Sequence, residues 1–264
     1  NLMEAHTSDE MQVIAEQVSP MLTEYSMYVS LNEHLFKRVK AVYEKRNELG
    51  LDKDQRILLE DSYKGFVRGG ANLSEEDKSV YSKWAEELSL ATLQFSKNVL
   101  AATNAYTLHI TDSTDLAGLP EYAKVMGAET AKEKGLEGWA FTLDYPSYGP
   151  FMKYSTVRNL REDMWKAYNS RALGGEFDNS EVVKTIVDLR IKMANILGYE
   201  TWADYQLEER MAKNRNTVNE FISQLLEPSM EFAKKDIESV FKYAKKNGFE
   251  GDKLMPWDFS FWSE

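Results

Sequence analysis

The feature that most constrains the fold of this chain is a long run of apolar residues at three- and four-residue spacing. The run begins after Ser74, and Asp77 follows this serine three residues later, a pairing typical of helix starts. Seven residues carry the spacing: Val80, Trp84, Leu88, Ala91, Phe95, Val99 and Ala102. The pattern predicts a helix of roughly thirty residues, about 45 Å long. A helix of this length with an apolar side needs flanking helices along its whole length, so the sequence predicts a largely helical protein.

Shorter patterns of the same kind predict further helices on both sides of this one. Before it, the helical pattern is predicted to break at Ser19 and Pro20, because serine is a preferred cap and proline fits the first helical position. Asp52 with Gln55 predicts another helix start by the same capping pattern. Apolar stripes in the last third of the chain predict three more helices, over residues 180–197, 201–211 and 217–247.

The middle of the chain departs from this helical pattern. Alternating apolar and polar residues at 139–143 predict a short, half-buried strand, and a similar segment at 106–111 predicts a second strand that pairs with it. Residues 145–150 contain two prolines and a glycine, which predict a turn instead of a helix or a strand. Apolar residues at helical spacing resume after Arg158 and predict that a helix follows.

Together these patterns predict an all-α fold, a multi-helix lobe with long helices and a small two-stranded β insert. They divide the chain into a long-helix segment at about residues 1–105, a small mixed insert at residues 106–150, and a second helical segment at residues 151–264. No unit repeats at a fixed spacing, which argues against a solenoid.

The charge and the composition of the chain exclude several kinds of partner and site. The 264 residues carry a formal net charge of −11, which opposes binding to nucleic acids. No run of apolar residues reaches the eighteen that a membrane span needs, so no membrane partner is predicted either. The chain has no cysteine, which excludes disulfides and thiolate metal sites. We expect a cytoplasmic protein, with the periplasm as the alternative.

The residues most often used in metal and acid–base chemistry do not form a recognisable motif. His6, His34 and His109 have no second histidine at helical spacing, and none is followed by glutamate, so the HExxH motif of zinc peptidases is absent from the sequence. Residues 112–115 lack the central glycine of a calcium loop and are predicted to form a turn. Adjacent acidic residues point in different directions on a helix and are predicted to be ordinary surface groups. We therefore predict no catalytic, cofactor-binding or metal-binding residue in this chain.

Three arginines in the central stretch allow two interpretations. Arg158, Arg161 and Arg171 lie in and just after one predicted helix. Guanidinium groups beside a cleft could hold the carboxylate of a peptide in a two-pronged contact. The alternative, which we favour, is that the three arginines neutralise acidic residues on adjoining helices.

Several short strings, taken in their order along the chain, resemble one family of enzymes. The strings are LFKRV at 35–39, FVRGGANL at 66–73, LAGLP at 116–120, TLDYPSY at 142–148, RNLRE at 158–162 and PWD at 256–258. They resemble the peptidyl-dipeptidase (dipeptidyl carboxypeptidase) and oligopeptidase A group of zinc peptidases, in the thimet oligopeptidase family. The resemblance covers essentially the whole chain and looks strongest to the bacterial dipeptidyl carboxypeptidase branch.

This resemblance implies a function that the motifs alone do not. Members of the group have two helical lobes beside a deep channel, with the zinc ligands and the glutamate that activates water in a part encoded downstream. The chain is therefore expected to be a non-catalytic amino-terminal fragment, part of the channel wall of an enzyme that releases carboxy-terminal dipeptides from oligopeptides. Its expected partners are the carboxy-terminal catalytic domain and, through the full-length protein, oligopeptide substrates; zinc belongs to the parent protein and is not bound by this segment. The alternative is a stand-alone helical binding or scaffold protein.

Overall fold

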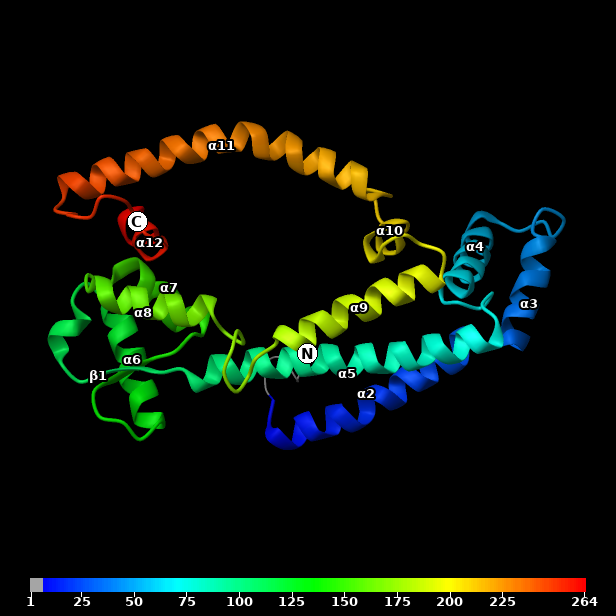
Figure 1. Ribbon diagram of the computed structural model, residues 1–264, viewed down its shortest axis with the longest axis horizontal. Coiled ribbons are helices and arrows are strands. Elements are labelled where there is room, and N and C mark those ends of the chain that lie inside the picture. Colours follow the sequence, from blue (N-terminus) through cyan, green and yellow to red (C-terminus); the bar gives the residue numbers. More distant parts are fainter. Residues whose placement is uncertain (1–6) are drawn as a thin grey trace. The chain divides into compact units, whose positions relative to one another are not determined.

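The computed structural model describes residues 7–264 and is almost entirely helical in this part of the chain. The prediction of an all-α fold with long helices and a small two-stranded insert is confirmed. The elements, in order (Figure 1), are α2 (Asp9–Ser30), α3 (Glu33–Glu44), α4 (Lys53–Arg68), α5 (Glu75–Ala105), β1 (Leu108–Ile110), the 3-10 helix η1 (Ser113–Leu116), α6 (Glu121–Glu133), β2 (Trp139–Phe141), α7 (Tyr145–Tyr154), α8 (Arg158–Asn169), α9 (Ser180–Ile196), α10 (Trp202–Leu207), α11 (Arg215–Lys246) and α12 (Pro256–Trp262).

The chain forms two compact units, each built from separate stretches of sequence. Unit 1 comprises Asn1–Lys97 and Glu181–Thr217, and unit 2 comprises Asn98–Ser180 and Val218–Glu264. The two units are defined by contacts in space and combine separate stretches of sequence. The three segments expected from the sequence are, in contrast, continuous stretches.

Unit 1 is organised around the long helix α5. This helix has 31 residues and starts after Ser74, whose hydroxyl bonds the side chain of Asp77 at 2.7 Å, as the sequence predicts. Helices α2 and α9 run alongside its unit 1 part (Figure 1). Tyr81 and Ala85 of α5 pack with Met193 of α9 in the buried centre of the unit.

Unit 2 is built around the two-stranded sheet and the helices that cover it. Strands β1 and β2 are antiparallel, with Leu108 opposite Phe141, so the predicted strand pairing is confirmed. Phe141 contacts Phe151 of α7 with ring centres 4.8 Å apart, and Met164 of α8 belongs to the same buried cluster. Ala140 is as buried as Phe141, so β2 is covered on both faces, in contrast to the half-buried strand expected from its alternation.

In unit 1, a proline lies inside a helix and not at its start. Helix α2 continues through Pro20, and the predicted break at this position is wrong. Ser19 does not cap a helix, because its hydroxyl oxygen lies 2.6 Å from that of Ser89 on α5. Ser8 provides the cap instead, where its side chain accepts a hydrogen bond from the N–H of Met11. Proline removes one backbone hydrogen bond, and helix α2 continues through Pro20 without that bond.

Two further prolines lie inside helix α7, so the turn predicted at residues 145–150 is wrong. Pro146 stands in the first turn of the helix, where a backbone N–H has no partner in any case. Pro150 lies four residues later and removes only the hydrogen bond to the carbonyl of Pro146. Phe151 and Met152 follow and are buried in the core of unit 2. Their burial stabilises the helix by more than the missing bond costs.

Two glycines that precede β2 give a test of the close packing between β1 and the turn before β2. Gly135 and Gly138 both have positive φ, 68° and 87°. A β-carbon on Gly138 would lie 2.3 Å from the carbonyl oxygen of Ile110, whereas one on Gly135 would meet nothing within 4 Å. We expect Gly135→Ala to lower the free energy of unfolding by about 1–2 kcal/mol, the strain of a left-handed alanine, and Gly138→Ala to lower it clearly more. Urea unfolding followed by circular dichroism measures both, and equal losses would contradict the predicted clash.

Candidate functional site

The most elaborate polar cluster lies in unit 2, where Arg161 is buried with a single carboxylate. Its side chain is 2% exposed and that of Asp258 is 0% exposed. Nη2 of Arg161 donates to Oδ1 of Asp258 at 3.3 Å, and its other nitrogens donate to the carbonyl oxygens of Ser155 at 2.6 Å and Trp257 at 3.1 Å. Burial lowers the pKa of the Arg161 guanidinium, and the charge of Asp258 opposes that shift. The cluster ties α8 to α12.

Arg158 binds the same carboxylate from the edge of the cluster. Its Nε and Nη2 donate to the two oxygens of Asp258, both at 2.8 Å, and this hydrogen bonding raises the pKa of the arginine. Both prongs of the guanidinium are therefore occupied within the chain. A groove of about 370 Å³ lies beside the cluster. For Arg158 and Arg161 the structure supports the interpretation that they neutralise an acidic residue on an adjoining helix.

Arg171 differs from the other two arginines. It donates to the carbonyl oxygen of Tyr168 at 2.8 Å and to the hydroxyl of Thr103 at 3.3 Å. Its guanidinium carbon also lies 3.8 Å from the centre of the Tyr168 ring, a cation–π contact. Since these partners are uncharged, the expectation that Arg171 neutralises an acidic residue is wrong.

Unit 1 has a second polar cluster, which the sequence analysis did not single out. Arg68, at the end of α4, forms an ion pair with Glu208 and donates to the carbonyl oxygen of Tyr205 at 2.7 Å. The hydroxyl of Tyr199 donates to the same carboxylate of Glu208 at 2.6 Å. These bonds lower the pKa of Glu208, and the bond from Tyr199 is the largest cause. The cluster joins α4 to the segment around α10, since Arg68 and Glu208 are 140 residues apart in sequence and bind each other directly.

The Tyr199 hydroxyl predicts a pH dependence of stability. Burial first, and the hydrogen bond to Glu208 second, raise its pKa to about 12. An unfolded tyrosine titrates near 10, so the folded chain holds this proton more tightly over that interval. The stabilisation is fully present below about pH 10 and is lost as the pH rises through the folded value. We expect the urea midpoint to fall more steeply from pH 9 to about 12 in the unsubstituted chain than in Tyr199→Phe; equal slopes would contradict the assignment.

The side chains of residues 7–264 do not form a zinc site; the family resemblance assigns zinc to the parent protein and not to this segment. Among residues 7–264 no three histidine, cysteine, aspartate or glutamate residues come together in a group that could hold a metal ion. His34 is exposed on α3, and Nε2 of His109 donates to the carbonyl oxygen of Glu137 at 2.6 Å. His6 lies outside the described residues. Asp112 accepts a hydrogen bond from the N–H of Thr114 and caps η1, so a short 3-10 helix stands where the sequence predicted a turn at residues 112–115.

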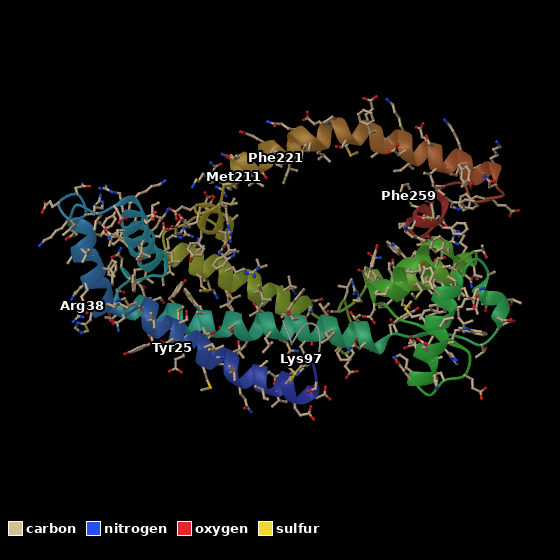
Figure 2. The ribbon with its side chains drawn as sticks, turned by 180° about the vertical axis from the view of Figure 1, so that it is seen from behind. Tyr25, Arg38, Lys97, Met211, Phe221 and Phe259 are labelled. Atoms are coloured by element: carbon tan, nitrogen blue, oxygen red, sulfur yellow. The ribbon has the colours of Figure 1, made fainter. Side chains whose placement is uncertain are left out.

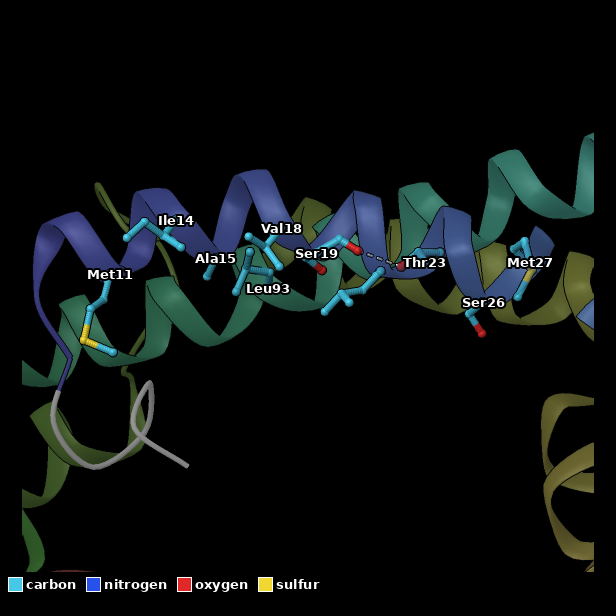
Figure 3. A pocket seen from close by; sticks show the side chains of 10 residues that line it. Met11, Ile14, Ala15, Val18, Ser19, Thr23, Ser26, Met27 and Leu93 are labelled. Atoms are coloured by element: carbon cyan, nitrogen blue, oxygen red, sulfur yellow. Dashed lines mark hydrogen bonds between the residues drawn. The ribbon is translucent and has the colours of Figure 1, made fainter. Parts of the chain in front are cut away.

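One groove in unit 1 has a mainly apolar lining. It has a volume of about 680 Å³ and runs between α2 and α5 (Figure 3). Its apolar lining includes Met11, Ile14, Val18, Leu22 and Leu93. This groove brings together no set of acid, base and nucleophile. Its lining suits the binding of apolar side chains. No helix in the described part of the chain is long and apolar enough to cross a membrane.

Comparison with known proteins identifies the relatives of this chain. Residues 151–264 match the family described as Peptidase family M3. Over its whole length the chain is 35% identical to oligopeptidase A of Escherichia coli (strain K12), and it covers 39% of that protein. It is 33% identical to the probable cytosolic oligopeptidase A of Arabidopsis thaliana, with 97% of this chain and 37% of that protein aligned. Identity to the dipeptidyl carboxypeptidase of Escherichia coli (strain K12) is 31%, over 98% of this chain and 38% of that protein.

These comparisons confirm the resemblance to the oligopeptidase A and dipeptidyl carboxypeptidase group. They do not support the expected preference for the dipeptidyl carboxypeptidase branch, because the identities to oligopeptidase A are slightly higher. The chain spans less than two fifths of the length of these curated relatives. By its sequence, the chain is a relative of the peptidases of family M3.

Proposed function

We propose that these 264 residues are the amino-terminal helical part of a longer zinc peptidase that acts on oligopeptides. In this proposal the segment forms part of the wall of the substrate channel, and the metal and the catalytic groups belong to the remainder of the protein. The observation that carries it is the similarity to oligopeptidase A along the whole chain, over only 39% of that relative's length.

The polar clusters of the two units are consistent with a supporting role. Arg158 and Arg161 are bound to Asp258, and Arg68 is bound to Glu208. Each of these acidic groups already has its cationic partner within the chain. We therefore assign no step of peptide hydrolysis to these residues, and we expect the segment alone to show no zinc-dependent peptidase activity.

The proposal is tested by comparing the 264-residue segment with the product of the complete gene that encodes it. Both are incubated with an oligopeptide whose amino terminus is blocked, and the products are identified by mass spectrometry with and without a zinc chelator. We expect the complete product to release carboxy-terminal dipeptides, the chelator to stop it, and the segment to leave the peptide intact.

Each other result has a distinct meaning. Chelator-sensitive cleavage only at internal bonds would support a peptidase and contradict the release of dipeptides. Zinc-dependent turnover by the segment would contradict the assignment of the chemistry to the remainder of the protein. A complete product with no peptidase activity would contradict the proposed function and favour a helical scaffold.

A further inference from the structure

The central part of helix α11 is exposed without interruption. Every residue at 219–239 is exposed, although this stretch spans almost six helical turns. The first side chain after it that is fully buried is that of Ala244, near the end of the helix. The helix therefore gains almost no stabilisation from the rest of unit 2 over these residues.

The exposed stretch is strongly two-sided. At about 100° per residue, large apolar side chains fall within one half of the helix, with Ile222 near the middle of this face. Their exposed fractions range from 47% to 65%, and Phe221 is labelled in Figure 2: they are Phe221, Ile222, Leu225, Leu226, Met230, Phe232 and Ile237. Most charged residues lie on the opposite side, whereas one carboxylate, that of Asp236, lies within the apolar face. The residues on the opposite side are Glu220, Glu227, Glu231, Lys234, Lys235 and Glu238.

Such a helix is not expected to persist without a partner. Isolated helices are marginal in water, and most helical stability in proteins comes from packing of the apolar face. Pro228 weakens the helix further, because a proline in a helix interior costs about 3 kcal/mol. Scattered exposed apolar residues need no explanation, but seven on one face of one helix mark an interaction surface.

We propose that this apolar face of α11, defined by the seven residues above, is a docking surface for an apolar segment of the same polypeptide outside these 264 residues. The inference rests on the proposed function, since curated relatives extend well beyond the aligned part and this chain covers 39% of oligopeptidase A. A segment of the same molecule has an effective concentration in the millimolar range, far above that of a second copy in dilute solution. Because of this higher effective concentration, we infer that the occupant is the rest of the same polypeptide and not a second copy.

The test places a photoreactive benzophenone side chain at single positions of α11 in the product of the complete gene. Ile222 and Leu226 are the probe positions on the apolar face, and Glu231 is the control, because it lies about 180° around the helix from Ile222. Circular dichroism first confirms that each variant is folded. After illumination, crosslinked peptides are identified by mass spectrometry.

We expect Ile222 and Leu226 to crosslink within one molecule to peptides outside residues 1–264, and Glu231 to give no such product. Crosslinks to a second copy would overturn the proposal in favour of self-association. Crosslinks confined to residues 1–264, or none at either probe position, would also overturn it. The readout does not depend on activity: an active enzyme without these crosslinks contradicts only this inference, and crosslinks in an inactive protein contradict only the proposed function.

Discussion

Replacing Asp258 with alanine is expected to lower the free energy of unfolding by about 3–5 kcal/mol, because it leaves a buried guanidinium without its carboxylate. Arg161 is buried, and Asp258 is its one acidic partner within residues 7–264. The substitution also removes the acceptor for the N–H of Met255, which Asp258 binds at 3.0 Å at the start of α12. Urea unfolding followed by circular dichroism measures the loss.

A matched control separates this effect from the general removal of an acidic residue. Glu162 lies on α8 and pairs with Lys166 at 2.6 Å, where the lysine is 58% exposed. Exposed pairs contribute little, so Glu162→Ala is expected to cost less than about 1 kcal/mol. Asp258→Asn keeps the shape and removes the charge, and it should also be destabilising. If Asp258→Ala cost no more than Glu162→Ala, the described role of the buried pair would be wrong.

Phe151→Ala is expected to produce the other large loss, about 3–5 kcal/mol, because it opens a cavity in the centre of unit 2. The Phe151 side chain is completely buried and makes an edge contact with Phe141 of β2. It lies on the second turn of α7, the helix that contains Pro146 and Pro150. Removing the Phe151 ring therefore also removes packing that offsets the destabilising effect of the two prolines. The measurement is again the urea midpoint and slope.

Tyr145 provides the control on the same helix. It is a large aromatic side chain that is 73% exposed, so Tyr145→Ala is expected to change the free energy of unfolding by less than about 0.5 kcal/mol. Similar losses for the two substitutions would show that α7 does not depend on its buried face.

The elements that the sequence predicted best are those specified by adjacent residues. Asp52 and Gln55 form the capping box at the start of α4, and the start of α5 at Ser74 was found in the same way. Both depend on contacts between side chains and backbone three residues apart, which a linear pattern contains. The two strands were also found, because alternation is a local signal.

The errors arose where distant residues outweigh a local preference. Pro20 and Pro150 predicted breaks, but both lie inside helices that pack against other elements. The partner of Arg161 is 97 residues away in sequence, and that of Arg68 is 140 residues away. No spacing rule connects residues so far apart, and so the second polar cluster was missed entirely.

By itself the sequence determined that this chain is helical, acidic, free of cysteine and related to the peptidases of family M3, because composition, periodicity and ordered motifs are all readable along one dimension. The tertiary structure was needed to show that Arg158 and Arg161 meet Asp258, which prolines a helix tolerates, and that the apolar face of α11 has no partner within unit 2. These outcomes depend on free energies of burial between segments that the order of residues leaves far apart.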